Sequence, residues 1–163
     1  MLTMLQRFSL LVFIYLAVVF ASIVLPSPAQ AAVISTTTLH DQFDTPITID
    51  ESTQWLIFSA DKEVSDQINQ AFDNLRMQDI KSKHGAYVAD ISKMPKLVTQ
   101  MFALPKMKKY NFKVMLDDEG TATATWPRQE KKATLMQLKN LEIVSTTFVG
   151  TTDEIQKFIK SQL

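Results

Sequence analysis

The chain has 163 residues, and its 17 lysine and arginine residues balance 17 aspartate and glutamate residues, so its formal net charge is zero. A balanced charge gives no global attraction to nucleic acid or to anionic membranes. The absence of cysteine excludes thiolate nucleophiles and disulfide exchange from the chemistry of this chain.

The N-terminal segment has the organisation of a secretory signal. Arg7 is followed by an almost unbroken apolar stretch over residues 8–25, then by two prolines and the small-x-small triplet Ala29-Gln30-Ala31. We therefore expect residues 1–31 to be a cleavable signal peptide. Residues 32–163 are then a single exported domain, periplasmic or secreted, and long enough for a core of its own.

An uncleaved N-terminal helix is the alternative. The apolar stretch is about 18 residues long, near the lower limit for crossing a bilayer, and it would then anchor the domain to the inner membrane. In that case this segment is the only contact with a membrane that we expect.

Beyond a small-residue lead-in over 32–38, expected to be loose, strand and helix patterns alternate. Pro46–Ile49 is predicted as a short edge strand, and the apolar run Trp55–Phe58 as a buried strand. Apolar residues from Val64 to Leu75 then follow helical spacing. Ala86–Ile91 is predicted as a second buried strand.

A second helix is predicted around Pro95, which is tolerated in a first helical turn. Pro105 is predicted to end or kink this helix. Four apolar residues are spaced so that we expect them to face the core: Leu97, Val98, Met101 and Phe102.

The C-terminal part is predicted to be mostly β-structure. Phe112–Leu116 is expected to be a third strand, Asp117–Gly120 a turn, and Thr121–Trp126 a threonine-rich alternating stretch. Ala133–Val149 has the pattern of a hairpin that turns at Lys139-Asn140. A last helix begins at Thr152, so the element order predicts an α/β fold with a mixed sheet.

Four segments resemble the thioredoxin-like superfamily, nearest to its peroxiredoxin and TlpA-type members. Leu39–Ile49 is similar to the family's lead-in, and Trp55–Ala60 resembles the strand that runs into the redox motif. Phe112–Gly120 resembles a strand and turn of the family, and Ala133–Leu163 resembles its closing hairpin and helix. The resemblance implies a three-layer α/β/α fold in which helices flank a mixed sheet.

Two departures separate the chain from that family. Asp61–Asp66 stands where the family has Cys-x-x-Cys, and Lys131-Lys132-Ala133 stands where it has a cis-proline. The chain therefore resembles a degenerate member, and peroxidase, disulfide reductase and isomerase activities lose their basis. We expect no catalytic residue.

Charged side chains around the vacated redox position form a candidate partner surface. Its acidic members lie where a helix N-terminus alone would favour carboxylates, and its basic members precede the closing hairpin. A further basic group precedes the third strand: Lys106, Lys108, Lys109 and Lys113. The candidate surface comprises Asp61, Glu63, Asp66, Trp126, Arg128, Lys131 and Lys132. The alternative is ordinary solvated loop charge.

Metal and nucleotide sites have weaker support. His40 and His84 lack the ligand spacing of zinc sites, and the isolated glycines exclude a dinucleotide-binding motif. Methionines such as Met94, Met101 and Met107 offer sulfur to Cu(I) but are more typical of core packing. We expect no cofactor and no metal.

The leading hypothesis is an exported, non-catalytic binding or accessory module of the bacterial envelope, with a protein partner and no nucleic acid. The alternative is a periplasmic metal-handling protein of the copper type, or a non-thiol redox-associated protein, that uses His40, His84 and the methionines. A cleft that brings either histidine close to methionine sulfur or carboxylates would favour the alternative.

Overall fold

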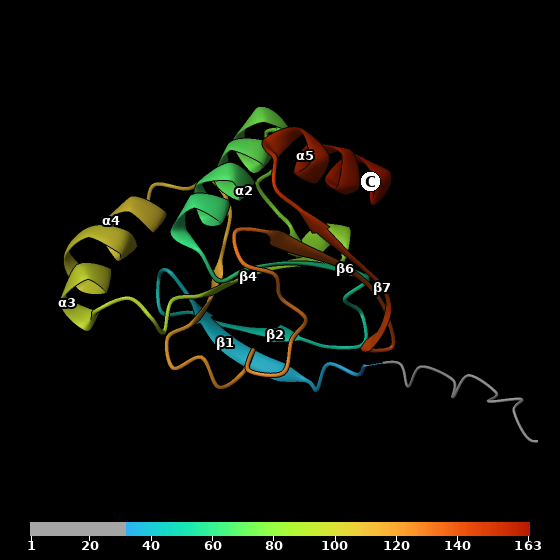
Figure 1. The fold of residues 1–163 in the computed structure, drawn as a ribbon, viewed down its shortest axis with the longest axis horizontal. Helices are drawn as coiled ribbons and strands as arrows, with labels where there is room; N and C mark the ends of the chain where they lie inside the picture. The colour runs from blue at the N-terminus through green and yellow to red at the C-terminus, as the bar shows by residue number, and fades with distance from the viewer. Residues whose placement is uncertain (1–31) are drawn as a thin grey trace, which may run out of the picture. The chain divides into compact units, whose positions relative to one another are not determined.

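The computed structural model describes residues 32–163; residues 1–31, to which the signal-peptide prediction applies, lie outside the described part. The described residues form a seven-stranded mixed sheet flanked by helices (Figure 1), in the order β2-β1-β5-β4-β3-β6-β7. The α/β fold with a mixed sheet is therefore confirmed. No helix within 32–163 has the length and apolar character needed to cross a membrane.

The elements follow the predicted order, with two additions that were not predicted, the strand β1 and the turn η2. The strands are β1 Thr37–Asp41, β2 Pro46–Ile49, β3 Trp55–Ser59, β4 Gly85–Asp90, β5 Met115–Asp117, β6 Ala133–Lys139 and β7 Glu142–Val149. The helices are α2 Lys62–Asn74, the 3₁₀ turn η2 Lys81–Lys83, α3 Lys96–Val98, the π-helical η3 Thr99–Ala103, α4 Leu104–Met107 and α5 Thr152–Ser161.

The central strands β3, β4 and β5 run parallel, and β6 joins β3 in antiparallel pairing. Every residue of β3 is buried. Because strand side chains alternate between faces, Trp55 and Ile57 enter the core cluster beneath α2 and α5, whereas Leu56 and Phe58 enter a second cluster on the opposite face. The sheet therefore supplies both cores of the domain.

Trp55 and Gly85 are packed against each other at the start of β3 and β4. The indole of Trp55 is 1% exposed and donates from Nε1 to the carbonyl of Lys83 at 2.8 Å. A Cβ added to Gly85 would lie 2.2 Å from the indole ring. Glycine is required here because the tryptophan ring occupies the space of a side chain.

The helix predicted after Pro95 exists, but its predicted inward face is wrong. Residues 96–107 form a continuous helical arm from α3 through η3 to α4, and Pro105 lies in the first turn of α4 instead of ending the arm. The arm packs on the core through Ala103, Leu104 and Met107. A π-helical turn holds more residues than an α-helical one, so η3 breaks the α-helical spacing behind the prediction, and only residues after Phe102 pack on the core. The four residues expected inside are exposed: Leu97, Val98, Met101 and Phe102.

The lead-in and the threonine-rich stretch also differ from expectation. The lead-in is ordered: Ile34 is 1% exposed, and β1 already begins at Thr37. Thr121–Trp126 forms turns and no strand. The carboxylate of Asp117 explains this, because it accepts the Thr123 N–H at 2.8 Å and so turns the backbone away from a sheet ladder.

The third strand is shorter than predicted because a side chain takes the place of a strand partner. The amide of Gln42 donates to the Phe112 carbonyl at 2.8 Å and accepts the Val114 N–H at 3.0 Å. Regular pairing of β5 therefore begins only at Met115.

We predict that Gly85→Ala lowers the free energy of unfolding by about 1–3 kcal/mol, because the new methyl group would overlap the buried ring of Trp55. Gly150→Ala is the matched control, since its Cβ would meet only the flexible end of Lys132 at 2.9 Å; its cost should stay within about 0.5 kcal/mol. Urea unfolding measures both, and equal costs would show that the contact between Trp55 and Gly85 is not tight.

Candidate functional site

The carboxyl ends of β3, β4 and β5 meet at one edge of the sheet. A polar or acidic side chain ends or follows each strand there: Ser59 at the end of β3 and Asp61 just after it, Asp90 at the end of β4 and Asp117 at the end of β5. In open α/β sheets this edge is where ligand sites form. It is also the edge to which the sequence assigned the vacated redox position.

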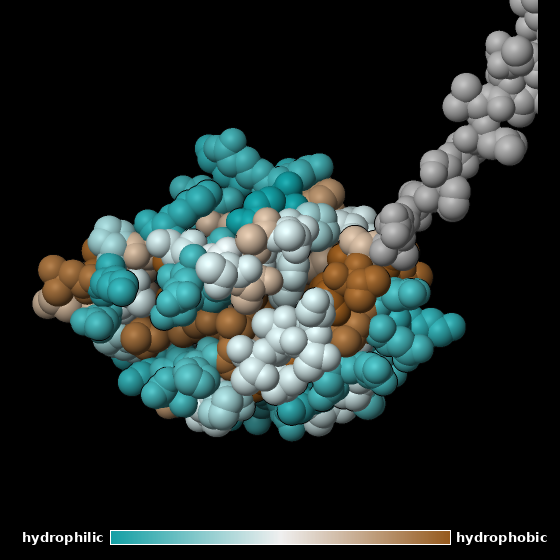
Figure 2. Space-filling model, turned by 90° about the horizontal axis from the view of Figure 1, so that it is seen from below, coloured by the Kyte–Doolittle hydropathy of each residue, from teal (hydrophilic) through white to brown (hydrophobic). Residues whose placement is uncertain are grey.

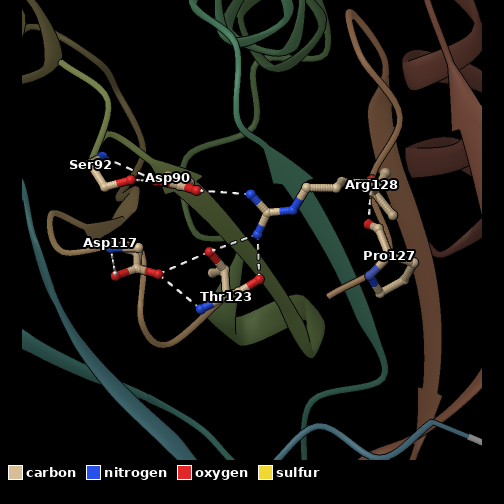
Figure 3. A network of polar contacts seen from close by, with 8 residues as sticks. Asp90, Ser92, Asp117, Thr123, Pro127 and Arg128 are labelled. Carbon is tan, nitrogen blue, oxygen red and sulfur yellow. Dashed lines mark hydrogen bonds and ion pairs between the residues drawn. The ribbon is translucent and has the colours of Figure 1, made fainter. Parts of the chain in front are cut away.

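Arg128 links this edge to the loop over residues 118–132, which precedes the closing hairpin (Figure 3). Its Nη1 lies 3.0 Å from Oδ2 of Asp90, and its Nη2 donates to the backbone carbonyl of Thr123. The guanidinium also lies over the ring of Phe58, 5.0 Å from the ring centroid. Three kinds of contact therefore hold one side chain, and with it the loop, against β4.

Asp90 is ionised in this arrangement. Burial of its carboxyl acts to raise its pKa, but hydrogen bonds from the hydroxyl and N–H of Ser92 and the guanidinium of Arg128 outweigh burial and lower the pKa. The Ser92 hydroxyl lies 2.6 Å from Oδ1. The side chain of Asp90 is 4% exposed, so its charge is buried with its partners in place.

Asp117 organises the first half of the same loop. Its Oδ1 accepts the Gly120 N–H at 2.8 Å, and its Oδ2 accepts the N–H and hydroxyl of Thr123 at 2.8 and 2.9 Å. Gly120 has a φ of +71°, a conformation that favours glycine. Asp117 thus holds Thr123 where Arg128 reaches it, and the two networks in Figure 3 act on one loop.

Asp61 and Lys131 meet at the N-terminal end of α2. Asp61 occupies the N-cap position, yet its side chain does not cap its own helix. Its Oδ2 instead accepts the backbone N–H of Lys131 at 3.0 Å, and Lys131 has a φ of +56°. A residue of the segment that the resemblance aligned with the redox motif, Asp61–Asp66, is therefore hydrogen-bonded to a residue of the segment that it aligned with the cis-proline, Lys131–Ala133.

Three hydroxyl groups near Asp61 are hydrogen-bonded to one another; those of Ser59 and Tyr87 are buried, and that of Ser65 is half-buried. The hydroxyl of Ser59 is 2.9 Å from that of Ser65 and 3.3 Å from that of Tyr87. Ser65 also donates to the carbonyl of Asp61 at 3.1 Å. Burial raises the pKa of Tyr87 to about 12, so its hydroxyl stays protonated. These partners offer neither serine a general base, which a serine nucleophile needs.

Asp66, an acidic member of the candidate surface, forms an ion pair with Lys106 of the basic group that precedes the third strand. Its carboxylate lies 2.5 Å from Nζ of Lys106 and 3.1 Å from Nζ of Lys62. Burial acts to raise its pKa, but these two ammonium groups outweigh burial and lower it. Asp66 is therefore committed to two partners within the domain, and Lys106 fastens the helical arm to α2.

Trp126 does not belong to a partner surface, contrary to the sequence prediction. It is 6% exposed, and its ring packs edge-on against Phe58 with centroids 5.4 Å apart. A single tryptophan in a loop carries no periodicity that shows its direction, and here it fills the second core cluster. Of the other candidate residues, Glu63, Lys131 and Lys132 have exposed positions, whereas Arg128 is tied to Asp90.

The two histidines lie apart from this edge and from each other. His40 pairs with Asp44 at 3.0 Å, with both side chains largely exposed, beside a cleft of about 600 Å³ that Met94 also lines. His84 is exposed, and its Nδ1 lies 3.2 Å from the Ser52 carbonyl. Within residues 32–163, no three His, Asp or Glu side chains converge to hold a metal ion.

Comparisons with solved structures identify the fold. StoA from Bacillus subtilis superposes with a TM-score of 0.55 at 16% identity, over 78% of this chain and 98% of that chain. A putative thiol:disulfide interchange protein DsbE from Chlorobium tepidum gives 0.53 at 16%, over 83% and 99%. Peroxidoxin BcpB from Mycobacterium tuberculosis gives 0.52 at 12%, over 80% and 96%.

The chain therefore has a thioredoxin-like fold, as the sequence resemblance implied, and it has this fold without any cysteine. No family model matches the sequence. No curated protein matches it either.

We predict that Arg128→Met lowers the free energy of unfolding at neutral pH by about 1–3 kcal/mol, since it leaves the buried Asp90 carboxylate without its cation. This range is below that of a fully buried pair because the Arg128 side chain is 35% exposed. Lys62→Met is the control, because its pair with Asp66 is exposed and should contribute at most about 0.5 kcal/mol. Equal effects in urea unfolding would contradict a structural role for Arg128.

Acid should diminish the effect of Arg128→Met. The pKa of folded Asp90 lies below its ordinary value of 3.8, so the stability from its charge is full above that value and is lost as the pH falls through the lower folded pKa. Protonated Asp90 has no charge for Arg128 to balance. The difference in the free energy of unfolding between wild type and variant should therefore shrink when urea unfolding is repeated at about pH 3. An unchanged difference would show that the effect of Arg128→Met comes from lost packing and not from lost charge.

Proposed function

We propose that residues 32–163 act as a non-catalytic protein-binding module in the bacterial envelope. The proposed contact surface is the corner formed by the first turn of α2 and residues 130–132, called the α2 corner below. The proposal rests on the hydrogen bond from the Lys131 N–H to the Asp61 carboxylate. This bond engages a side chain in the segment where the resembled family has its reactive cysteine.

The chemistry of the α2 corner supports binding over catalysis. Asp61 offers a carboxylate where the resembled family has a thiolate, and one of its oxygens is already bound to the backbone. The hydroxyls of Ser59 and Ser65 bond to each other and to other groups of the fold. With no cysteine in the chain, thiol turnover has no nucleophile.

The exposed charges of the α2 corner are suited to recognising a partner. Lys62 and Glu63 project from the first turn of α2, and Glu130, Lys131 and Lys132 are exposed on the loop. Both signs of charge are present, which favours specificity of docking over strong nonspecific attraction. Because Asp61 and Arg128 fix the loop, less conformational entropy is lost on binding.

The signal-like sequence of residues 1–31 supports the envelope location. The similar fold of a putative thiol:disulfide interchange protein is consistent with a place among proteins of that type, here without the thiol step. One observation favours the metal-handling alternative, since His40 lies 3.0 Å from the Asp44 carboxylate and both line a cleft that Met94 also lines. Against it, His84 does not line this cleft, and within residues 32–163 no three His, Asp or Glu side chains converge.

We predict that the purified protein reduces neither peroxide nor insulin above the buffer rate, because both reactions need a sulfur nucleophile or an equivalent. The measurement is turnover with an excess of dithiothreitol, compared with a thioredoxin-type enzyme as positive control. Turnover that survives Asp61→Asn would place catalysis elsewhere in the domain, and turnover abolished by it would make Asp61 catalytic; either result contradicts a pure binding role.

A photo-crosslinker placed at the α2 corner should capture a protein partner in the cell envelope. p-Benzoylphenylalanine would replace Glu63 or Lys132, both exposed. Lys139 provides the control, because it is exposed at the far end of β6, roughly 20 Å from Ala133 at the rise of a strand.

We expect the same crosslinked protein from positions 63 and 132 and none from position 139. The product from position 63 should be lost on Lys131→Glu with Lys132→Glu. Capture at all three positions, or at none, would contradict the proposed surface. Circular dichroism of each variant confirms that the domain remains folded.

A further inference from the structure

We propose that the helical arm, residues 96–107, docks on an anionic lipid surface together with the residues on either side of it. The proposed contact spans residues 93–109, which are the continuous helix from α3 through η3 to α4 and the turns before and after it. This contact is separate from the α2 corner and does not depend on the function proposed for that corner. It also adds to the sequence prediction, which limited membrane contact to the N-terminal segment.

The outer face of the arm is an exposed apolar stripe. Four of the eight large apolar side chains that the described residues expose lie within six positions: Leu97 at 66%, Val98 at 40%, Met101 at 59% and Phe102 at 68%. Their spacing of one and four residues places them on one side of a helix. Figure 2 shows an apolar group protruding at the left end of the molecule, the end that α3 occupies in Figure 1. Contiguous exposed apolar surface of this kind marks an interaction site.

The charge of the arm and its flanking turns is entirely positive. Residues 93–109 contain five lysines and no acidic residue: Lys93, Lys96, Lys106, Lys108 and Lys109. Lys106 is neutralised by Asp66; the other four have no carboxylate within ion-pair distance among residues 32–163. Lys93 and Lys96 stand at the start of a helix, where the backbone dipole disfavours cations. Helix stability therefore does not explain them.

Exposed apolar residues flanked by lysines are typical of helices that lie in a membrane interface. The apolar side chains enter the boundary of the acyl chains, and each nearby lysine adds attraction to anionic headgroups. A second copy of the chain fits this face less well, because the unpaired lysines of two arms would repel each other. The neighbouring cleft, which Lys96 and Lys108 line, also has four acidic residues, Asp41, Asp44, Asp118 and Glu119, but none of the four residues of the stripe lines it.

The arm is firmly attached to the domain at its C-terminal end. Met107 is buried, its carbonyl accepts from the Gln42 amide at 3.3 Å, and Lys106 pairs with Asp66. Its N-terminal half, α3 and most of η3, has no buried residue. A lipid surface can therefore cover the stripe without any change in the core.

The test uses Phe102→Trp as a depth probe in the full chain and in the chain from residue 32, which contains all seven strands and both core clusters. Val144→Trp is the matched control, because Val144 is 63% exposed on β7. Trp55 and Trp126 are buried and give a constant background. Emission is recorded with vesicles of phosphatidylcholine alone and with added phosphatidylglycerol, each with and without brominated acyl chains.

We expect blue-shifted emission and bromine quenching for the tryptophan at position 102 only, in both chain lengths, and only with phosphatidylglycerol. Replacing the four unpaired lysines with glutamine should weaken vesicle binding at least about tenfold, given the attraction of each lysine to anionic lipid. Binding of the full chain without quenching at position 102 would overturn the proposal.

Three other outcomes would assign the stripe to a different occupant and also overturn the proposal. One is a blue shift in the full chain without vesicles that is lost in the chain from residue 32, since residues 1–31 would then cover the stripe. Another is concentration-dependent dimerisation abolished by Phe102→Ser. The third is a shift with polyglutamate but not with vesicles, which would indicate an acidic protein.

Discussion

The ion pair between Arg128 and Asp90 is the interaction on which the candidate site depends. The loop over residues 118–132 crosses the carboxyl edge of three parallel strands without forming a strand or helix of its own. Its position is set by the guanidinium of Arg128, which bonds to Asp90, to the Thr123 carbonyl and to the face of Phe58. With that side chain in place, Trp126 fills the second core cluster, and Lys131 reaches Asp61.

In this thioredoxin-like fold, the carboxyl ends of the central strands are therefore held to the neighbouring loop by carboxylates and hydrogen bonds, with no cysteine involved. A carboxylate accepts a backbone N–H at the first turn of α2, and a residue with positive φ, Lys131, supplies that N–H. Both groups are held by hydrogen bonds, so the corner presents fixed charges instead of a reactive atom. The helical arm, which contacts α2 through Lys106 and Asp66, presents a surface of another kind, apolar and uniformly basic. One small domain therefore has two exposed surfaces of different chemistry.

Sequence patterns identified the elements in which the spacing of apolar residues matches the spacing of the buried positions. The apolar run of β3, the helical spacing of α2 and the β6–β7 hairpin were all predicted in place, because neighbouring residues decide each of them. The arm was predicted as a helix, but the prediction of which residues face the core was wrong. A π-helical turn shifts the helical register, and only the C-terminal end of the arm packs on the core.

The contacts that build the site had no local signal. Asp90 and Arg128 lie 38 positions apart, and Asp61 and Lys131 lie 70 apart. The proximity of Asp61 to the segment before the hairpin was expected only through the family resemblance. Short-range cues did exist for the turns at the sheet edge, since Asp90 precedes Ser92 by two positions and Asp117 precedes Gly120 by three, spacings at which aspartate binds its own backbone.

Amide hydrogen exchange of Lys131, followed by NMR, tests the α2 corner most directly. If Asp61 and Arg128 hold the loop as a fixed surface, exchange of this amide in the native protein should be at least about tenfold slower than in an unstructured chain. The protection should disappear in Asp61→Ala and in Arg128→Met, and remain in Glu63→Ala, whose side chain is exposed. An amide that exchanges at the unstructured rate in the wild-type protein would contradict a preformed, closed corner.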